Sequence, residues 1–445
     1  MYVKLIQPRM EMRPMDTELK TRMSPPLGLY TIVSLLRNEH QVVVQNENIE
    51  TLEYDHPDIV GIMVSLDVLP RAVEISTRFR AMGVPVVAGG VHITTAYNTV
   101  YEGAFDSLCI GAAEGTWPYI MHDLAEGNLK PQYRCDHPIK GSEIVSPAYD
   151  LIPRDKYLFC NIIHTSRGCP FRCDFCYNSF GEHHYVHREV DDVIAEIKAI
   201  GRRHIMIIDD NFIGNPHWTR ELLQAMIPLH IKWNAAVSIN VVDIDGMLDL
   251  MKESGCQGLF IGFESINPSS IGGVHKVQND RARYEYAIRE IHRRGIMINA
   301  SFVFGLDDDT PEVFRQTLDW IVKQKLETVT SHILTPYPGT TLYSEFERDG
   351  RLTDTNLSNY NTAHVVFKPR NMTPEQLREG YLWIYRELYS FKNILRRMPR
   401  ARSQWLAYLT FNLLYRKFGR WTDRVCKRLT YERVGLFAEK LARYL

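Results

Sequence analysis

Three cysteines stand close together in the segment Cys169-Pro170-Phe171-Arg172-Cys173-Asp174-Phe175-Cys176. Thiolates are soft ligands suited to iron–sulfur centres. Three cysteines in one tight loop can hold three irons of a cubane cluster and leave the fourth iron open. An open iron can bind a substrate-like molecule, whereas a site with four cysteine ligands cannot. The spacing therefore predicts redox-active iron–sulfur chemistry at Cys169, Cys173 and Cys176.

A zinc knuckle or a buried group of thiols is the alternative interpretation of this loop. Zinc would need a fourth ligand, which His183, His184 or His187 could supply just downstream. Structural zinc sites usually use two paired arms of the Cys-x-x-Cys type, so a single loop favours the cluster. The other cysteines are scattered and form no disulfide pattern: Cys109, Cys135, Cys160, Cys256 and Cys426.

Two series of alternating strands and helices must position the cysteine loop. In the first series, short apolar runs predict strands at Tyr2–Ile6, Gln41–Val44, Ile59–Val64, Pro85–Ala88 and Ser107–Ile110. Periodic segments between them predict helices near Pro26–Arg37, Leu69–Met82 and Thr116–Glu126. Residues 1–130 are therefore predicted to form a Rossmann-like domain with a parallel sheet. Gly89-Gly90, after the fourth strand, fits a ligand at the carboxyl edge of that sheet.

The second series follows residues 131–158, which contain several prolines and are interpreted as a linker. Its predicted strands are Asn161–Thr165, His204–Ile208, Lys232–Val237, Gly258–Gly262, Met297–Phe304 and Thr328–Leu334. Its predicted helices are Val190–Ile200, Trp218–Ile227, Ile244–Glu253, Asp280–Arg294 and Pro311–Lys323. Residues 159–345 are expected to form a partial β/α barrel of six units, since a complete barrel needs about 250 residues. Residues 346–445 are predicted to be helical, so the chain as a whole is of the α/β class.

The cysteine loop resembles that of a known superfamily. Its Cys-x-x-x-Cys-x-x-Cys spacing directly after a strand, with the aromatic Tyr177 beside the last cysteine, is similar to the cluster loop of radical S-adenosylmethionine (radical SAM) enzymes. Thr165-Ser166-Arg167-Gly168 and Tyr177-Asn178 resemble the branch that carries a cobalamin-binding domain. The resemblance covers nearly all of residues 1–345 and, more loosely, the helical tail.

The resemblance implies a [4Fe–4S] cluster on the three cysteines and S-adenosylmethionine on its open iron, beside Tyr177. One electron would come from an external donor such as flavodoxin or a dedicated reductase. Cleavage of the sulfonium C–S bond would give methionine and a 5′-deoxyadenosyl radical. That radical would abstract hydrogen from an unactivated carbon of a natural product, sugar or lipid. The protein would supply positioning and a dry cavity.

Polar residues at the predicted strand ends fit such a cofactor site. Asp209, Asp210 and Asn211 end the second strand of the barrel, where acidic groups suit the cationic amine of the cofactor. The other interpretation is a helix cap, because Asp and Asn are good capping residues. Ser238 and Asn240 end the third strand and suit ribose hydroxyls or a carboxylate.

Later strands add further candidates. Glu264 ends the fourth strand after an apolar run, so it is expected to point into the cavity. Ser301 and Asn299 lie in the fifth strand, where simple strand alternation is the other explanation. The segment Thr335-Pro336-Tyr337-Pro338-Gly339-Thr340 resembles the family's loop after the sixth strand, although its Pro and Gly also suit a rigid turn. Candidates for a proton donor, by position only, are Tyr337, His332 and the pair His183–His184.

The first domain resembles the family's cobalamin-binding domain in Pro25-Pro26-Leu27-Gly28-Leu29, His56-Pro57-Asp58-Ile59-Val60-Gly61 and Gly89-Gly90-Val91-His92. Two features depart from the family. The Asp-x-His-x-x-Gly motif is absent, and the loop from Pro8 to Pro26 contains no histidine. Gly111-Ala112-Ala113-Glu114 replaces the usual Gly-Glu-Gly-Glu. Members of this branch can bind cobalamin without a histidine ligand, so cobalamin remains an expected cofactor, with a relic domain that binds none as the alternative.

Charge is unevenly distributed along the 445 residues, whose formal net charge is −1. From Lys392 to the end there are 14 Lys and Arg against 3 Asp and Glu, so the rest of the chain carries −12. A basic, aromatic tail of this kind suits a membrane surface or an acidic flavodoxin, or it caps the barrel with its Arg stems. No nucleic-acid partner is expected, since no groove-reading module is evident. The start lacks the apolar run of a signal peptide, so a cytoplasmic location is expected.

The favoured hypothesis is cobalamin-dependent methylation of an unactivated carbon in biosynthesis. The first alternative uses the same radical without cobalamin, for dehydration or deoxygenation of a sugar diol of the aminoglycoside type, with a partner reductase. A more distant alternative is a non-catalytic iron–sulfur electron carrier. The three-cysteine count disfavours it, because a carrier has little use for an open iron.

Overall fold

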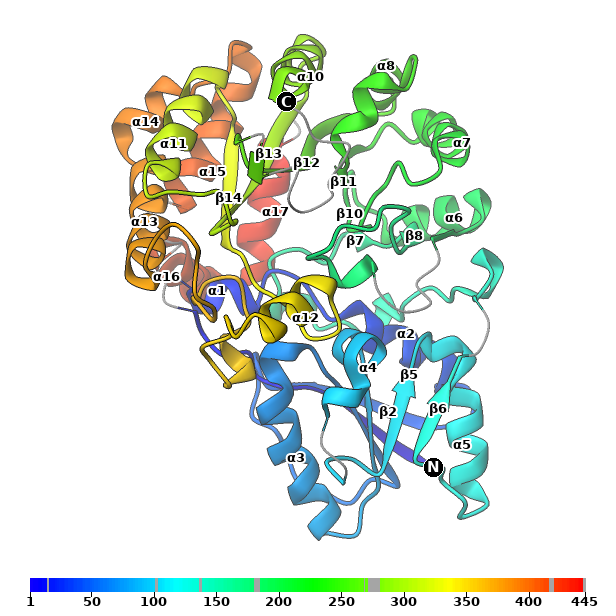
Figure 1. The fold of residues 1–445 in the computed structure, drawn as a ribbon. Helices are drawn as coiled ribbons and strands as arrows, with labels where there is room; N and C mark the ends of the chain where they lie inside the picture. The colour runs from blue at the N-terminus through cyan, green and yellow to red at the C-terminus, as the bar shows by residue number, and fades with distance from the viewer. Residues whose placement is uncertain are drawn as a thin grey trace.

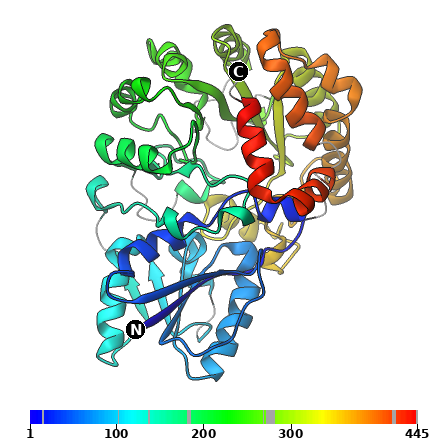
Figure 2. The same ribbon diagram turned by 180° about the vertical axis from the view of Figure 1, so that it is seen from behind.

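Two parallel sheets and a helical end make up the protein (Figure 1). The computed structural model describes residues 1–13, 16–100, 103–135, 138–179, 185–267, 269–270, 281–415 and 420–442. Figure 2 shows the same arrangement from behind, with the first sheet at one end of the molecule and the second sheet at the other. The α/β class with a partial barrel and a helical carboxy-terminal region is confirmed.

The first sheet has six parallel strands in the order β2-β1-β3-β4-β5-β6. Its strands are β1 Tyr2–Gln7, β2 Gln41–Asn46, β3 Ile59–Met63, β4 Val86–Gly89, β5 Ser107–Ile110 and β6 Gln132–Arg134. Its helices are α1 Glu18–Thr21, α2 Leu27–Leu36, α3 Leu69–Ala81, α4 Val91–Ala96 and α5 Trp117–Ala125. Leu5 packs in a core with α2 and α5, whereas Ile62 packs in a separate core with α3, so helices cover both faces. β6 is a difference from the sequence analysis, because it lies in the segment interpreted as a linker.

The second sheet also has six parallel strands, in the order β14-β13-β12-β11-β10-β7. These are β7 Ile162–Ile163, β10 His204–Ile207, β11 Lys232–Val237, β12 Cys256–Glu264, β13 Met297–Phe304 and β14 Thr328–Ile333. The helices that follow them are α6 Val190–Ile200, α7 Pro216–Met226, α8 Met247–Glu253, α10 Arg281–Arg293 and α11 Val313–Gln324. Because strand side chains alternate, Ile298 and Phe302 of β13 join the core under the helices, and Asn299 and Ser301 face the inside of the barrel.

The chain leaves the second sheet early at β7, and this shortens the predicted strand Asn161–Thr165. It then forms an antiparallel ribbon of β8 Ser166–Arg167 and β9 Val186–His187, and the cysteines lie between these two strands. The predicted helix at Pro311 begins at Val313 instead. Asp280 of the predicted helix Asp280–Arg294 lies outside the described residues.

Helices complete the chain: α12 Thr341–Arg348, α13 Pro374–Leu388, α14 Phe391–Arg396, α15 Trp405–Tyr415, α16 Arg420–Leu429 and α17 Tyr431–Ala442. A capping box begins α13, since Thr373 Oγ1 accepts from the Gln376 N–H at 3.2 Å and Gln376 Oε1 accepts from the Thr373 N–H at 2.8 Å. Over the ranges given above, every helix is too short or too polar to cross a bilayer.

Gly90 provides a test of how tightly the carboxyl edge of the first sheet is packed. Its φ is +115°, and a Cβ added there would lie 2.8 Å from the Val64 carbonyl oxygen. We expect Gly90→Ala to lower the free energy of unfolding by about 2–3 kcal/mol, because backbone strain adds to the clash. Gly83→Ala is the matched control, with φ +77° and open space around the new methyl group. Urea unfolding measures both, and equal losses in the two variants would contradict the expectation.

Candidate active site

The cysteine loop is a compact, half-buried turn that starts at Gly168, whose φ is +79°. Cys173 is buried, and its carbonyl oxygen accepts a hydrogen bond from the Cys176 N–H at 3.1 Å. Burial raises the pKa of the Cys176 thiol to about 12, and the nearby Cys173, Cys169 and Asp210 raise it further against a backbone hydrogen bond from Asn178. The three thiols therefore act on one another electrostatically. Metal ions would have to displace their protons, so metal binding is expected to strengthen as the pH rises.

The described residues do not gather three or more His, Cys, Asp or Glu side chains around a single metal-sized point. Of the proposed zinc ligands, His187 instead stacks on Trp218, with 4.8 Å between ring centroids, and its Nε2 lies 3.4 Å from Asn215 Nδ2. His183 and His184 lie outside the described residues.

The two carboxylates at the end of β10 take different positions. Asp209 is buried and accepts hydrogen bonds from the Thr165 N–H at 2.7 Å, Thr165 Oγ1 at 2.5 Å and Ser166 Oγ at 2.7 Å. Asp210 is exposed, and its Oδ2 accepts from the Gly168 N–H at 3.2 Å. Asp209 therefore anchors the start of the ribbon, while Asp210 lies beside the cysteine loop, where its carboxylate can reach a cationic ligand.

The predicted polar residues of the next strand end form one hydrogen-bonded group. Asn211 Nδ2 donates to Ser238 Oγ at 3.3 Å, and Asn211 Oδ1 accepts from the Ser238 N–H at 3.2 Å. Ser238 Oγ donates to Asn240 Oδ1 at 2.5 Å. The structure thus brings Asn211, Ser238 and Asn240 together at the carboxyl edge of the barrel.

Glu264 ends β12 in a strained conformation. Its φ is +64°, unusual for a residue with a side chain, and the β12–β13 register shifts between Gly262 and Glu264. Gly262 pairs with Ser301 and Glu264 pairs with Phe302, so Glu264 and Ser301 lie at adjacent positions of neighbouring strands. A strained backbone conformation of this kind is kept only where the surrounding contacts hold it in place, and it often occurs at functional sites. Glu264 is buried at this edge. That its side chain points into the cavity stays a prediction.

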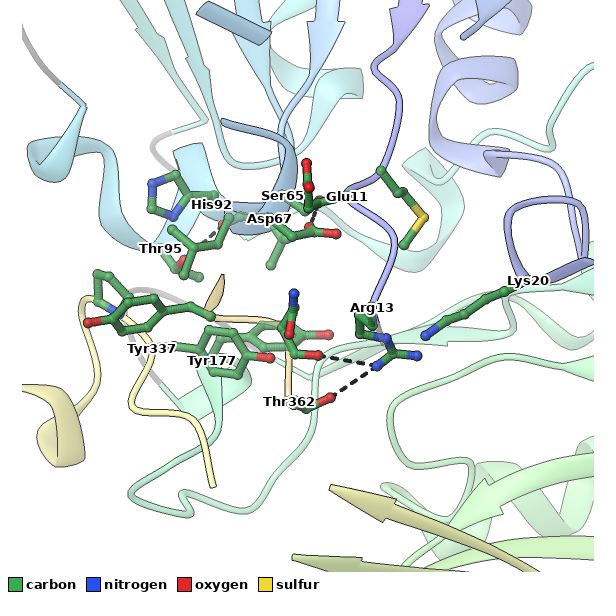
Figure 3. Close-up of a pocket in the computed structure, with 16 residues that line it drawn as sticks. Glu11, Arg13, Lys20, Ser65, Asp67, His92, Thr95, Tyr177, Tyr337 and Thr362 are labelled. Atoms are coloured by element: carbon green, nitrogen blue, oxygen red, sulfur yellow. Dashed lines mark hydrogen bonds between the residues drawn. The ribbon is translucent and has the colours of Figure 1, made fainter. Parts of the chain in front are cut away.

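A cavity of about 320 Å³ lies between the two sheets (Figure 3). One wall comes from the carboxyl edge of the first sheet, with Ser65, His92 and Thr95, and the opposite wall includes Tyr177 and Tyr337. The rings of these two tyrosines meet edge to face, with 6.3 Å between centroids. Burial raises the pKa of Tyr337 to about 12, so its hydroxyl keeps its proton at neutral pH. The cavity therefore lies between the first sheet and Tyr177, the residue that follows Cys176.

Arg13 closes one side of this cavity, and the sequence analysis missed it. Its Nη1 donates to the Asn361 carbonyl oxygen at 3.2 Å and to Thr362 Oγ1 at 3.3 Å (Figure 3). Its Nε donates to Asp16 Oδ2 at 2.8 Å. Thr362 has a φ of +65°, and its Oγ1 lies 3.2 Å from Nδ1 of His332. Burial lowers the pKa of His332 to about 4, so the imidazole is neutral at pH 7. No local pattern could have paired residues so distant in the chain.

A second link joins the first sheet to the cysteine loop. The guanidinium of Arg167 donates to both carboxylate oxygens of Glu114, at 2.7 and 3.0 Å. Glu114 lies just after β5, in the segment that departs from the family pattern, and its side chain is 5% exposed. A partly buried bidentate pair of this type fixes relative orientation as well as distance. Gly339 adds a third contact, since its backbone packs against the Thr95 carbonyl oxygen of α4.

Residues 163–321 match the model of the radical SAM superfamily, and residues 340–412 match a domain of unknown function (DUF4070). The first match begins in β7 and includes the cysteine loop and the strand ends described above. The chain is also 29% identical over 403 residues to bacteriochlorophyllide d C-12(1)-methyltransferase of Chlorobaculum tepidum, covering 87% of this chain and 88% of that one. Residues 163–321 are a radical SAM domain.

Other comparisons place this radical SAM enzyme in the branch with a cobalamin-binding-type domain. The hopanoid C-2 methylase of Rhodopseudomonas palustris is 26% identical over 347 residues, covering 74% of this chain and 65% of that one. The solved structure of the radical SAM methyltransferase TsrM from Kitasatospora setae, with cobalamin and a [4Fe–4S] cluster bound, has a TM-score of 0.68 at 16% identity. That match covers 99% of each chain. The likeness to TsrM shows that both sheets share its fold.

The pH dependence of stability tests the role of Asp209. Burial raises the pKa of this carboxyl from 3.8 to about 6 against the hydrogen bonds from Thr165 and Ser166, which lower it. The folded protein thus binds the proton more tightly than the unfolded chain, so this contribution is present below pH 3.8 and is lost as the pH rises through about 6. We expect Asp209→Asn to flatten that decline by about 3 kcal/mol, at 1.36 kcal/mol per pKa unit.

Ser166→Ala is the companion variant for this measurement. It removes one donor that favours the charged carboxylate, so the decline in stability should move to higher pH. Urea unfolding across this pH range, monitored by far-ultraviolet circular dichroism, gives the comparison. An unchanged pH profile in both variants would show that Asp209 is not the group that titrates.

Proposed function

We propose that this radical SAM enzyme methylates an unactivated carbon of a small organic molecule, with cobalamin as the methyl carrier. When bound, the groups would supply the hard chemistry: a reduced [4Fe–4S] cluster to cleave S-adenosylmethionine to a 5′-deoxyadenosyl radical that takes hydrogen from the substrate, and methylcobalamin as the source of the methyl group. The observation that carries the proposal is the cavity between Tyr177, the residue after Cys176, and the carboxyl edge of the first sheet. The relatives named above methylate a bacteriochlorophyllide and a hopanoid, which supports the choice of reaction.

Each part of the chain takes a role in this proposal. Residues 1–130 would hold cobalamin, because ligands of open parallel sheets bind outside the carboxyl ends of the strands. Residues 159–345 would hold the cluster and S-adenosylmethionine, with residues 131–158 as the connection and residues 346–445 as a helical support. The loop after β1 contains no histidine, so residues other than a histidine of that loop would hold cobalamin. His92 is buried, with Nε2 3.2 Å from Thr99 Oγ1, so we assign it a polar contact at the cavity wall.

The residues around the cysteine loop would orient S-adenosylmethionine. Cys169, Cys173 and Cys176 would hold three irons and leave the fourth for the amine and carboxylate of the cofactor. Asp210 would accept a hydrogen bond from the N–H groups of that amine, because Asp210 lies beside the loop, whereas Asp209 is hydrogen-bonded to the start of the ribbon. The predicted ribose and carboxylate contacts would come from the hydrogen-bonded group at the second and third strand ends and from the neighbouring strands: Asn211, Ser238, Asn240, Glu264, Ser301 and Tyr177.

The substrate would occupy the cavity and meet Tyr337 there. Tyr337 and His332 remain the candidates for a group that handles a proton, with His332 acting through its contact with Thr362. An external donor such as flavodoxin or a dedicated reductase would supply the electron, and we place the enzyme in the cytoplasm, where such donors are found.

Asp210→Asn tests the assignment of the cofactor amine. Charge-assisted hydrogen bonds contribute about 1.5–3 kcal/mol, so we expect S-adenosylmethionine to bind roughly tenfold or more weakly to the reconstituted variant. Asp245→Asn is the control, since it removes an exposed carboxylate that follows a different strand. Equilibrium binding of S-adenosylmethionine under anaerobic conditions measures the effect. Equal affinity in Asp210→Asn and the unaltered protein would remove Asp210 from the site.

Anaerobic reconstitution with iron, sulfide and cobalamin tests the function itself. We expect corrin absorption bands that persist through gel filtration, and 5′-deoxyadenosine on reduction with S-adenosylmethionine. Cys176→Ala should abolish 5′-deoxyadenosine, whereas Cys160→Ala, which removes a half-buried thiol outside the loop, should retain it. Loss of the corrin bands alone would favour the cobalamin-independent dehydration of a sugar diol. Absence of 5′-deoxyadenosine from a protein with a cubane spectrum would indicate an electron carrier.

A further inference from the structure

The carboxy-terminal helices α14 and α15 leave large apolar side chains in solvent. Phe391 and Leu395 on α14 are 56% and 61% exposed, and Leu406 on α15 is 50% exposed. Trp405 and Leu413 on α15 are exposed as well. Single exposed hydrophobic residues are normal on a protein surface. A group of them on two adjoining helices indicates a surface that contacts a binding partner. We call the exposed side chains of residues 391–413 the α14–α15 surface.

The same surface is purely cationic. Between Glu387 and Asp423 the sequence contains no Asp or Glu. Lys392, Arg396, Arg400 and Arg402 are exposed among the apolar side chains. The guanidinium of Arg402 also lies 5.8 Å from the ring centroid of Trp405. Basic residues interleaved with aromatic and aliphatic ones, without carboxylates, are the composition of a segment that lies on an anionic lipid interface.

A buried arginine fixes these helices to the barrel. Arg397 is completely buried and donates to the carbonyl oxygens of Leu326 at 2.9 Å and Leu388 at 2.7 Å, and to Asn412 Oδ1 at 3.2 Å. Tyr408 of α15 donates to the Ile394 carbonyl oxygen of α14 at 2.6 Å. Arg397 therefore acts as a cap on the barrel, as one interpretation of the sequence predicts. The exposed cations of the α14–α15 surface do not attach these helices to the barrel in this way.

The surface lies at the amino-terminal edge of the second sheet. Leu326 directly precedes β14, and Gln404 donates to the carbonyl oxygen of Gly295, which precedes β13, at 3.0 Å. The cysteine loop lies at the carboxyl edge, beyond the whole length of the strands, which is about 20 Å for a strand like β14 at 3.3 Å per residue. Figure 1 shows α14 and α15 beside α11, remote from the first sheet. A reductant bound here would be far from the cluster site.

We propose that the α14–α15 surface docks the enzyme on an anionic lipid membrane. The apolar side chains would enter the headgroup region while the four exposed cations contact lipid phosphates. A second copy of the chain fits poorly, because a twofold contact would bring cations against cations. An acidic redox protein matches the charge of this surface, but it would bind at the amino-terminal edge of the second sheet, away from the cysteine loop at the carboxyl edge. Docking in this orientation leaves the carboxyl edge and the cavity open to a reductant from solution.

Flotation of the full-length, reconstituted protein with lipid vesicles tests the proposal. We expect binding to vesicles of phosphatidylcholine mixed with phosphatidylglycerol, little binding to phosphatidylcholine alone, and weaker binding as salt is raised. The variant K392Q/R396Q/R400Q/R402Q should bind at least about a hundredfold more weakly, since each basic residue near the surface contributes about a factor of five. The double variant Phe391→Ser/Leu395→Ser should also bind vesicles more weakly, and changing the salt concentration should not restore its binding.

The matched control is K198Q/R289Q/K323Q/R348Q, which removes the same charge from exposed positions elsewhere. It should bind vesicles like the unaltered protein. Formation of 5′-deoxyadenosine in the absence of vesicles should be equal in all these proteins, which separates this inference from the proposed function. Equal binding by the two charge variants would overturn the proposal. So would an unaltered protein that does not bind vesicles but captures an acidic flavodoxin or self-associates, where that interaction is lost in K392Q/R396Q/R400Q/R402Q.

Discussion

The buried carboxylate of Asp209 holds the point at which the chain leaves the barrel. It gathers the Thr165 N–H and the hydroxyls of Thr165 and Ser166 at the end of the neighbouring strand. The cysteine loop begins two residues later, so the direction of that loop depends on this hydrogen-bonded group. Burying a carboxylate is costly, and the three donors offset only part of that cost, since burial still raises the pKa of Asp209 to about 6. The neighbouring Asp210 is exposed and is available to a ligand.

The cavity depends on contacts between parts of the chain that fold as separate layers. Arg167 and Glu114 join the ribbon to the first sheet, and Arg13 joins the loop after β1 to Thr362. Charge-assisted pairs suit this task because they have directional geometry as well as strength. A radical generated beside the cysteine loop would have to meet a group bound at the first sheet. The proposed methylation therefore depends on how rigidly these contacts hold the two parts of the chain together.

The sequence predicts best where the relevant residues are local or follow a fixed topological rule. The cysteine loop lies within eight residues, and the carboxyl ends of parallel strands meet at one edge, so Asp210, Ser238 and Glu264 could be grouped in advance. The contact between Arg13 and Thr362 spans 349 positions and leaves no periodic signal. Arg397 looked like any other cation of the basic tail until its burial among carbonyl oxygens separated it from the exposed ones.

The cavity wall is built from segments far apart in the chain: the loop after β1, the carboxyl edge of the first sheet, Tyr177 and the segments that follow β14. Arg13 emerges early from the ribosome, whereas Asn361 and Thr362, which accept its hydrogen bonds, are synthesised hundreds of residues later. The cavity is thus among the last features to be completed during synthesis. Cofactors that fill it would have to enter a nearly finished protein, and cofactor loading becomes a late step of maturation, sensitive to truncation at the carboxy-terminal side.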